Sequence, residues 1–354
     1  MTSQLELHNL MQAVVIHKHG GVSQLSFEQV PLPKVGHNEV LVKLRAAAIN
    51  HLDLWVREGW PGLRVAMPHI LGSDGAGVVA EAGAGVEGHR EGDEVLLAPG
   101  WSGCGCRNCL AGDDNLCSKY RILGEQLPGT YAEFVRVPAE NAFPIPKGLS
   151  FEEAAAIPLV FLTAWNMLVH QARVQPGEDV LILAAGSGVG SAGIQIAKLF
   201  GARVIATASS EEKLRKARQL GADDVINYQE EDLLDLVMSH TDRRGVDIVF
   251  EHVGKSTWNA SIKSLRKGGR LVTCGATTGF DAVTDLRYVF FRGIRIIGNF
   301  MGRKAGLRDA LEFFPDKLRP VIDRTFDLKN ASKAHERMAR REQFGKIVLT
   351  IDEK

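Results

Sequence analysis

Four of the five cysteines of this chain lie close together. Cys104, Cys106, Cys109 and Cys117 have the spacing C-x-C-x2-C-x7-C. Four thiolates on one loop can close a tetrahedral zinc site, and a closed site is structural because no position is left for a substrate. An odd cysteine count with this clustering favours a metal site in a reducing, cytoplasmic compartment over a disulfide framework. We predict one structural Zn²⁺ that folds a loop lacking its own core; a lobe with four free thiols is the alternative.

A glycine-rich segment suggests a second kind of chemistry. Val180–Gly190 has the sequence VLILAAGSGVG, an apolar strand that leads into a helix. Small residues there let the backbone approach a pyrophosphate, whose charge meets the N–H groups of the helix start. Because Gly193 of a literal G-x-G-x-x-G lies inside the helix, we prefer the register Ala185-x-Ser187-x-x-Gly190. The predicted cofactor-binding residues here are Gly186, Ser187, Gly188, Val189 and Gly190; a turn without a ligand is the alternative.

The end of the following strand bears on the choice of cofactor. Ala208 stands where an acid would bind the adenosine ribose hydroxyls of NAD. Ser209, Ser210 and Lys213 are suited to hold a 2′-phosphate instead. The pair Glu211–Glu212 argues against a phosphate, but it also suits the first turn of a helix. We therefore expect NADPH in preference to NADH.

Composition limits the remaining possibilities. The chain has 354 residues, 45% hydrophobic and 24% charged, which suggests two globular domains and excludes wholesale disorder. Its formal net charge is zero, so it lacks the basic excess of a typical nucleic-acid binder. No apolar run approaches the roughly 20 residues that span a bilayer. Met1–Leu10 has no signal-peptide pattern, and we expect a loose extension there with order beginning near Met11.

The predicted elements change character along the chain. Up to about Val137 they are β-like, with one short helix at His51–Glu58 that Gly59 ends. After Pro146, the capping-box residues Ser150 and Glu153 predict one helix rich in alanine and leucine. The expected β-like strands are 40–45, 95–97 and 134–137; the later strands are 179–185, 203–207, 224–226, 246–250, 270–274 and 295–297, with helices at 189–200 and 211–220. Residues 305–354 predict two helices and a last strand, 346–351. Alternating strands and helices imply a doubly wound parallel sheet, an α/β fold.

Further motifs carry a family resemblance over residues 11–351. The segments are PHILGSDGAGVV at Pro68–Val79, GDEV at Gly92–Val95, GTYAEF at Gly129–Phe134, AAIP at Ala155–Pro158 and FGKIVL at Phe344–Leu349. In this order they resemble the medium-chain dehydrogenase/reductase superfamily of zinc-type alcohol dehydrogenases and quinone oxidoreductases. The resemblance implies a GroES-like catalytic domain with a partly opened β-barrel core, residues 1–155 and 301–354, with its cysteine lobe at about 100–120. It also implies a Rossmann cofactor domain, residues 156–300.

The resemblance also implies roles for single residues. Lys346 would contact cofactor phosphate, and Thr163 would lie near the nicotinamide. Tyr228 would lie near the adenine end. The other residues expected along the nicotinamide are Cys274, Gly275, Ala276, Asn299 and Phe300. Cys274 is expected to be a small buried wall residue and not a nucleophile.

The catalytic zinc site of the family has poor counterparts here. Its three ligand positions fall at Asn50, Ser73 and Leu159, and leucine cannot bind a metal. His51, His69, Asp53 and Asp74 offer a substitute ligand set, although each is more simply a solvated or packing residue. Asn50 matches the asparagine of zinc-free quinone and enone reductases. We take Asn50 as the first catalytic candidate, with Thr163 nearby; a helix N-cap role for Asn50 is equally open, and Arg57 is expected to be exposed.

Without a catalytic metal, hydride transfer to a quinone or an enone is less demanding than transfer to an unactivated ketone, because hydrogen bonds can stabilise the enolate or hydroquinone oxygen. We therefore expect an NADPH-dependent oxidoreductase that reduces quinones or α,β-unsaturated carbonyls. The alternatives are a zinc-dependent alcohol dehydrogenase with an unusual ligand set, and a nucleotide-binding protein without turnover. The resemblance implies a homodimer or homotetramer, and the apolar edge Gly293–Gly298 is suited to pair with its copy across a two-fold axis. We expect no nucleic-acid or membrane partner.

Overall fold

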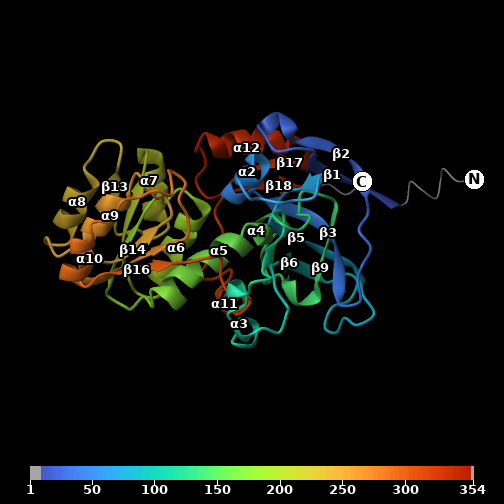
Figure 1. Cartoon of the computed structure of the whole chain (residues 1–354), viewed down its shortest axis with the longest axis horizontal. Helices are drawn as coiled ribbons and strands as arrows, with labels where there is room; N and C mark the ends of the chain where they lie inside the picture. The colour runs from blue at the N-terminus through green and yellow to red at the C-terminus, as the bar shows by residue number, and fades with distance from the viewer. Residues whose placement is uncertain (1–8, 352–354) are drawn as a thin grey trace, which may run out of the picture. The chain divides into compact units, whose positions relative to one another are not determined.

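The computed structural model describes residues 9–351, which form two compact units (Figure 1). Unit 1 comprises Met1–Leu159 and Arg319–Lys354, and unit 2 comprises Val160–Leu318. Most of the expected N-terminal extension, residues 1–8, lies outside the described residues. Within that described part, no helix is long and apolar enough to cross a membrane.

The second boundary between the units lies at 318/319, not at the expected 300/301. The segment that follows residue 300 packs on the first helices of unit 2. The Phe314 ring lies edge-on to Phe161 at 4.9 Å, and the Phe313 ring lies 5.7 Å from Trp165. Gly302 also approaches the Leu162 carbonyl so closely that a Cβ would come within 2.6 Å of the oxygen. These contacts keep residues 301–318 with the cofactor-type unit.

Unit 1 is built from β-sheets. Within the described residues it holds a three-stranded sheet and a seven-stranded sheet whose centre is β3 (Glu39–Ala48). Strand β3 pairs antiparallel with β5, β9 and β18. The larger sheet also contains β10 (Ala142–Pro144), β6 (Glu94–Leu97), β5 (Asp74–Ala82), β18 (Lys346–Thr350), β17 (Ile322–Asp327) and β9 (Phe134–Pro138); the smaller sheet contains β2 (Ser26–Pro31), β1 (Leu10–Ile16) and β4 (His69–Ile70). The predicted strands at 40–45, 95–97 and 134–137 are confirmed.

Unit 1 also contains helices, among them the short α3 (Arg107–Leu110) in the cysteine lobe and three that are described next. α2 (His51–Glu58) has the predicted bounds, and Gly59 follows it at φ 78°. α4 (Phe151–Ala155) begins at Ser150, whose hydroxyl accepts a hydrogen bond from the Glu153 N–H, as the capping box predicted. α12 (Ala331–Ala339) packs against α2 and β18. The helix predicted after Ser150 is short, because a break at residues 156–157 separates α4 from α5 (Pro158–Trp165).

The tail also differs from its prediction. α11 (Lys304–Leu311) and α12 are the two expected helices, and β18 is the expected last strand. Between the helices lies β17, which the sequence did not indicate. β17 is half-exposed and pairs parallel with β18 alone in the described residues. An edge strand with few buried side chains has little of the apolar alternation that identifies a strand.

Unit 2 is a Rossmann-type α/β unit. Its sheet has six strands among the described residues, all parallel, in the order β13-β12-β11-β14-β15-β16. The strands are β11 (Asp179–Ile182), β12 (Arg203–Ala208), β13 (Asp224–Asn227), β14 (Val246–Glu251), β15 (Leu265–Thr273) and β16 (Arg295–Gly298). The strand order reverses direction beside β11, and such a switch point creates a crevice at the carboxyl ends of the strands. The predicted α/β fold is confirmed.

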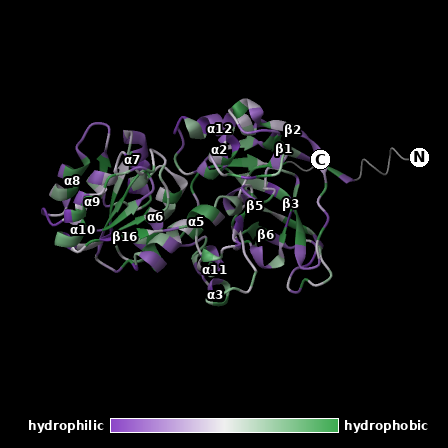
Figure 2. Cartoon of the chain, viewed as in Figure 1, coloured by the Kyte–Doolittle hydropathy of each residue, from purple (hydrophilic) through white to green (hydrophobic). Residues whose placement is uncertain are grey.

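Helices cover both faces of this sheet. Val249 of β14 packs in a cluster with Val237 of α8 (Leu233–His240) and Ile262 of α9 (Trp258–Ser264). The next residue, Phe250, points the other way and meets Gly193 of α6 (Gly188–Leu199). Figure 1 shows α8 and α9 on the opposite side of the strands from α6. Figure 2 shows the strands as hydrophobic and α7 (Glu211–Gln219) as largely hydrophilic. α10 (Leu286–Arg292) packs near β15.

Candidate functional site

Three buried polar side chains meet in unit 1. The Lys346 ammonium donates to Asn50 Oδ1 at 2.6 Å and to Asp74 Oδ2 at 2.8 Å. Asn50 Nδ2 donates to the same Asp74 oxygen at 2.8 Å. All three side chains are buried, and Asp74 is 0% exposed. Lys346 and Asp74 therefore form an internal ion pair, and the Asn50 amide is hydrogen-bonded to both of these charged groups.

Strand register brings these residues together. Ala48, near the end of β3, lies opposite Asp74 of β5 on one side and opposite Val348 of β18 on the other. Asn50 follows Ala48 by two residues, at the start of α2, and Lys346 precedes Val348 by two residues. The resemblance implied a phosphate contact for Lys346. In the structure its ammonium binds Asn50 and Asp74, because this register places it beside both.

Asn50 also occupies the predicted N-cap position of α2. Its N–H donates to Asp53 Oδ2 at 2.8 Å, so Asp53 closes the first turn. The side chain of Asn50 is engaged by Lys346 and Asp74. The cap position and the polar contact are thus compatible in one residue, because the backbone serves the helix and the amide faces the ion pair.

A hydrogen-bonded chain continues from Asp53. The Tyr131 hydroxyl donates to Asp53 Oδ2 at 2.9 Å and lies 3.2 Å from His335 Nε2. Arg57 Nη1 donates to His335 Nδ1 at 3.0 Å. Arg57 is 2% exposed, so the expectation of an exposed arginine is wrong. Its guanidinium turns inward because the Gly20 carbonyl and the imidazole both accept from it.

Burial controls the charges along this chain. Burial, with the nearby Arg57 charge, lowers the pKa of His335 to about 3, so the imidazole is neutral and its Nδ1 can accept from Arg57. Burial raises the pKa of Asp53 to about 7. Asp53 Oδ1 is buried and has no hydrogen-bond partner within residues 9–351. Asp53 is therefore a group of this chain that changes protonation near neutral pH.

The remaining catalytic-zinc positions make structural contacts. The Ser73 hydroxyl donates to the Leu123 carbonyl at 2.8 Å, and the Leu159 N–H donates to Asp74 Oδ1 at 2.8 Å. His69 Nε2 lies 3.1 Å from the Gly124 carbonyl. Within the described residues, the cysteine cluster is the one group of three or more histidine, cysteine or acidic side chains placed to hold a metal. Because asparagine, serine and leucine are poor or impossible zinc ligands, this donor set does not fit a catalytic zinc.

The predicted cofactor residues of unit 2 lie at the carboxyl ends of its parallel strands. Tyr228 follows β13 and is 42% exposed. Ser209 and Ser210 follow β12, and Ser210 caps α7, accepting from the Lys213 N–H. Cys274–Ala276 follow β15, and Asn299 and Phe300 follow β16. A dinucleotide binds at this edge of a doubly wound sheet.

The glycine-rich turn fits a pyrophosphate. Ser187 is the N-cap of α6, and its hydroxyl accepts from the Gly190 N–H at 2.8 Å, which supports the register chosen from the sequence. A Cβ at Gly190 would lie 2.5 Å from the Ala184 carbonyl oxygen, so no side chain fits there. Ala184 itself has φ 46°, a conformation rare outside glycine. Gly193 instead provides close packing of the helix on the sheet.

Thr163 is buried in unit 2, whereas Cys274 is half-buried and is not the fully buried residue that the sequence predicted. Thr163 lies on α5, is buried, and its hydroxyl has no hydrogen-bond partner in the part of the chain that the structure describes. An orphaned buried hydroxyl is costly unless a ligand satisfies it, which suits its expected place near a nicotinamide. Burial raises the pKa of Cys274 to about 12, so this thiol is protonated and a poor nucleophile.

Several residues of these sites were not identified from the sequence. His252 follows β14, and its Nε2 lies 3.0 Å from the Ser187 hydroxyl at the glycine-rich turn. Its position at a strand end was the only available signal. Tyr131 and His335 reach Asp53 from distant parts of the sequence, and no local spacing connects them.

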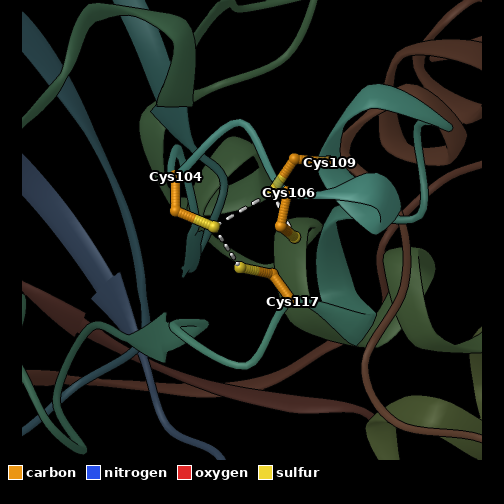
Figure 3. A group of neighbouring side chains, drawn as sticks. All are labelled: Cys104, Cys106, Cys109 and Cys117. Atoms are coloured by element: carbon orange, nitrogen blue, oxygen red, sulfur yellow. Dashed lines mark hydrogen bonds between the residues drawn. The ribbon is translucent and has the colours of Figure 1, made fainter.

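The cysteine lobe assembles as a metal centre would require. Figure 3 shows the four thiols pointing toward one another. Their sulfur atoms lie within 4.8 Å of one another, with Cys104 Sγ 3.3 Å from Cys117 Sγ and Cys106 Sγ 3.6 Å from Cys109 Sγ. A tetrahedral zinc with bonds of about 2.3 Å separates its sulfurs by about 3.8 Å, so the donor set fits zinc. Gly105 at φ 63° turns the chain between the first two cysteines and accommodates the short first gap.

Comparisons with known proteins agree with this architecture. The family model "Alcohol dehydrogenase GroES-like domain" matches residues 36–147, and "Zinc-binding dehydrogenase" matches residues 188–316. An alcohol dehydrogenase of Geobacillus stearothermophilus is 33% identical over 97% of this chain and 100% of that relative. A quinone oxidoreductase of Rattus norvegicus is 28% identical over 97% of this chain and 98% of its own length. The crystal structure of an NAD-dependent alcohol dehydrogenase matches with a TM-score of 0.94 and 49% identity, covering 97% of this chain and 100% of that one.

Sequence motifs, the two-unit architecture and relatives aligned over nearly their full length thus agree. The chain belongs to the medium-chain dehydrogenase/reductase superfamily of zinc-type alcohol dehydrogenases and quinone oxidoreductases, and it is an oxidoreductase.

Proposed function

We propose that this protein is an NADPH-dependent reductase of quinones or α,β-unsaturated carbonyls that works without a catalytic metal. The observation that carries the proposal is the set of Asn50, Ser73 and Leu159 at the three metal-ligand positions. None of the three is a good zinc ligand, and Asn50 is held by Lys346 and Asp74.

This site chemistry favours a conjugated acceptor. The bound cofactor supplies the hydride and is itself oxidised. When a hydride adds to the β-carbon of an enone, the carbon–carbon π electrons move toward the carbonyl oxygen, and a proton from water completes the reduction. The negative oxygen needs a hydrogen-bond donor, and the Asn50 amide is our candidate. Thr163, with its orphaned hydroxyl, is the second polar group that we assign to the substrate and nicotinamide region.

The choice of NADPH rests on the end of β12. Ala208 provides no acid for the ribose hydroxyls, and Ser209, Ser210 and Lys213 lie in the segment where a 2′-phosphate would be held. The similar protein of solved structure is called NAD-dependent, so both cofactors belong in the first assay. A preference for NADPH of at least about tenfold in kcat/KM is our expectation.

We also propose one structural zinc on the cysteine lobe and assembly through β16. The sulfur separations support the zinc. β16 pairs only with β15 in the described part of the chain, and Phe290, Phe291 and Ile296 near it are exposed. An exposed apolar edge strand favours pairing with a second copy. We therefore expect a homodimer, or a tetramer of dimers, and cytoplasmic location for a protein with reduced thiols.

The central experiment follows NADPH oxidation at 340 nm with an enone and, in parallel, with its saturated ketone and a quinone. We expect turnover with the enone or the quinone, little with the saturated ketone, and no loss of activity when a chelator is added briefly. Turnover of simple alcohols and ketones that follows the content of a second zinc would refute the proposal in favour of a zinc alcohol dehydrogenase. Cofactor binding without turnover across a broad panel would favour the non-catalytic alternative.

A further inference from the structure

The polar contacts around Asp74 join two of the three metal-ligand positions to one buried carboxylate. Asn50 and Leu159, at the first and third metal-ligand positions, both donate to the Asp74 carboxylate: Asn50 Nδ2 to Oδ2 and the Leu159 N–H to Oδ1, each at 2.8 Å. The positive charge facing this carboxylate is the ammonium of Lys346, which is 3% exposed. Two of the three metal-ligand positions of the zinc branch thus donate here to an acid that is paired with a lysine.

We propose that the Lys346 ammonium is the fixed cation of this site, and that it positions and polarises the Asn50 amide toward the substrate oxygen. Lys346 is in this view a positioning residue, since it acts through Asn50. The inference rests on the proposed function, in which Asn50 contacts the oxygen that becomes negative.

The orientation of the Asn50 amide follows from the chemistry of its partners. An ammonium can only donate, so the amide oxygen must face Lys346, and an ionised carboxylate can only accept, so the amide nitrogen must face Asp74. A flipped amide would oppose donor to donor and acceptor to acceptor. The Ala48 carbonyl is the other acceptor near Asn50 Nδ2 and lies 3.4 Å away, a weak contact. The second N–H of this amide is therefore held only weakly, and a substrate oxygen would have to take the place of the Ala48 carbonyl.

Polarisation adds to positioning. A hydrogen bond from a cation to the amide oxygen draws electron density from the amide nitrogen and makes its N–H a better donor. Both Asn50 and Asp74 are buried, so water does not screen the effect strongly. The ammonium also occupies the acceptors that a divalent metal would need, which agrees with the poor metal-ligand set.

The test compares Lys346→Met and Lys346→Arg with the unaltered protein, using NADPH and an enone or quinone substrate. We expect Lys346→Met to lower kcat by about ten- to a hundredfold, with NADPH Kd changed by less than about twofold, and Lys346→Arg to recover part of kcat. Lys213→Met should instead weaken NADPH binding. Lys147→Met, an exposed loop substitution, is the matched control and should change neither quantity.

A rise of about tenfold in NADPH Kd with unchanged kcat in Lys346→Met would overturn the inference, because it would assign Lys346 to the cofactor phosphate. Lys346→Met leaves Asp74 buried without its cation, so this variant is at risk of misfolding. The double variant Lys346→Met with Asp74→Asn removes both charges together. We expect it to regain thermal stability but not kcat; recovery of kcat would show that the ammonium only neutralises Asp74.

Failure of the inference and failure of the proposed function give different results. If no enone or quinone supports NADPH oxidation by the unaltered protein, the proposed function is refuted, and the inference is refuted with it. If the unaltered protein is active and Lys346→Met is equally active, the inference alone is refuted.

Discussion

Replacing Asp53 by asparagine should make unfolding of this protein less sensitive to pH. Asp53 is 0% exposed, and burial raises its pKa from 3.8 to about 7. The folded state therefore holds the Asp53 proton more tightly than the unfolded state does. The contribution of the protonated Asp53 carboxyl group to the stability of the fold is fully present below pH 3.8 and is lost as the pH rises through about 7. The amide that replaces the carboxyl group in the Asp53→Asn variant cannot be ionised, so this loss disappears.

The magnitude follows from the two pKa values. At about 1.4 kcal/mol per pH unit, a rise from 3.8 to about 7 corresponds to about 4 kcal/mol over the whole titration. Between pH 5 and pH 8, this one group should lower the free energy of unfolding of the unaltered protein by about 3 kcal/mol. The full value applies because no part of the side chain is exposed to solvent screening.

The assay is denaturant unfolding of zinc-loaded protein at pH 5, 6.5 and 8, followed by tryptophan fluorescence. The control is Asp281→Asn, which changes an exposed carboxylate paired with Lys255. The free energy of unfolding of the control should change with pH as that of the unaltered protein does. The free energy of unfolding of Asp53→Asn, relative to that of the unaltered protein, should rise by about 3 kcal/mol from pH 5 to pH 8. Parallel profiles for Asp53→Asn and the unaltered protein, within about 1 kcal/mol, would refute the assignment of Asp53 as the titrating group.

Three further predictions concern other parts of the chain. Zinc analysis of protein purified without added metal should find about one zinc per chain; Cys109→Ser should lose it and Cys274→Ser should keep it, whereas two zincs would support a catalytic metal. Gly190→Ala should raise NADPH Kd by about tenfold or more, measured by calorimetry, since its Cβ would lie 2.5 Å from the Ala184 oxygen; unchanged affinity would contradict the pyrophosphate site. Ile296→Asp should convert an oligomer to monomers, measured by sedimentation. An unchanged oligomer would exclude the β16 edge as the interface between copies of the chain.

Local sequence patterns predicted most of the elements correctly. The helix at His51–Glu58, the cap at Ser150 and the strand and helix series of unit 2 depend on hydrophobic periodicity and on capping residues within a few positions. β17 escaped prediction because it is an edge strand with few buried side chains. The boundary between the units at 318/319 was not predicted, because this boundary depends on aromatic contacts of Phe313 and Phe314 with helix α5.

Sequence spacing also predicted how two groups of neighbouring residues come together in the structure. The cysteine lobe and the glycine-rich turn each lie on one short segment, where spacing nearly determines geometry. The poor zinc ligands at Asn50, Ser73 and Leu159 were likewise evident from residue types.

The sequence by itself therefore determined which residues are available for chemistry and which of them are poor zinc ligands. The tertiary structure alone decided what Asn50 touches. Lys346 lies far from Asn50 along the chain, and only the pairing of β18 with β3 and of β3 with β5 brings its ammonium to Asn50 and Asp74. The same holds for Tyr131 and His335 at Asp53. The physical reason is that a buried charge must find its partner in space, and sheet register sets that partner without leaving a local pattern in the sequence.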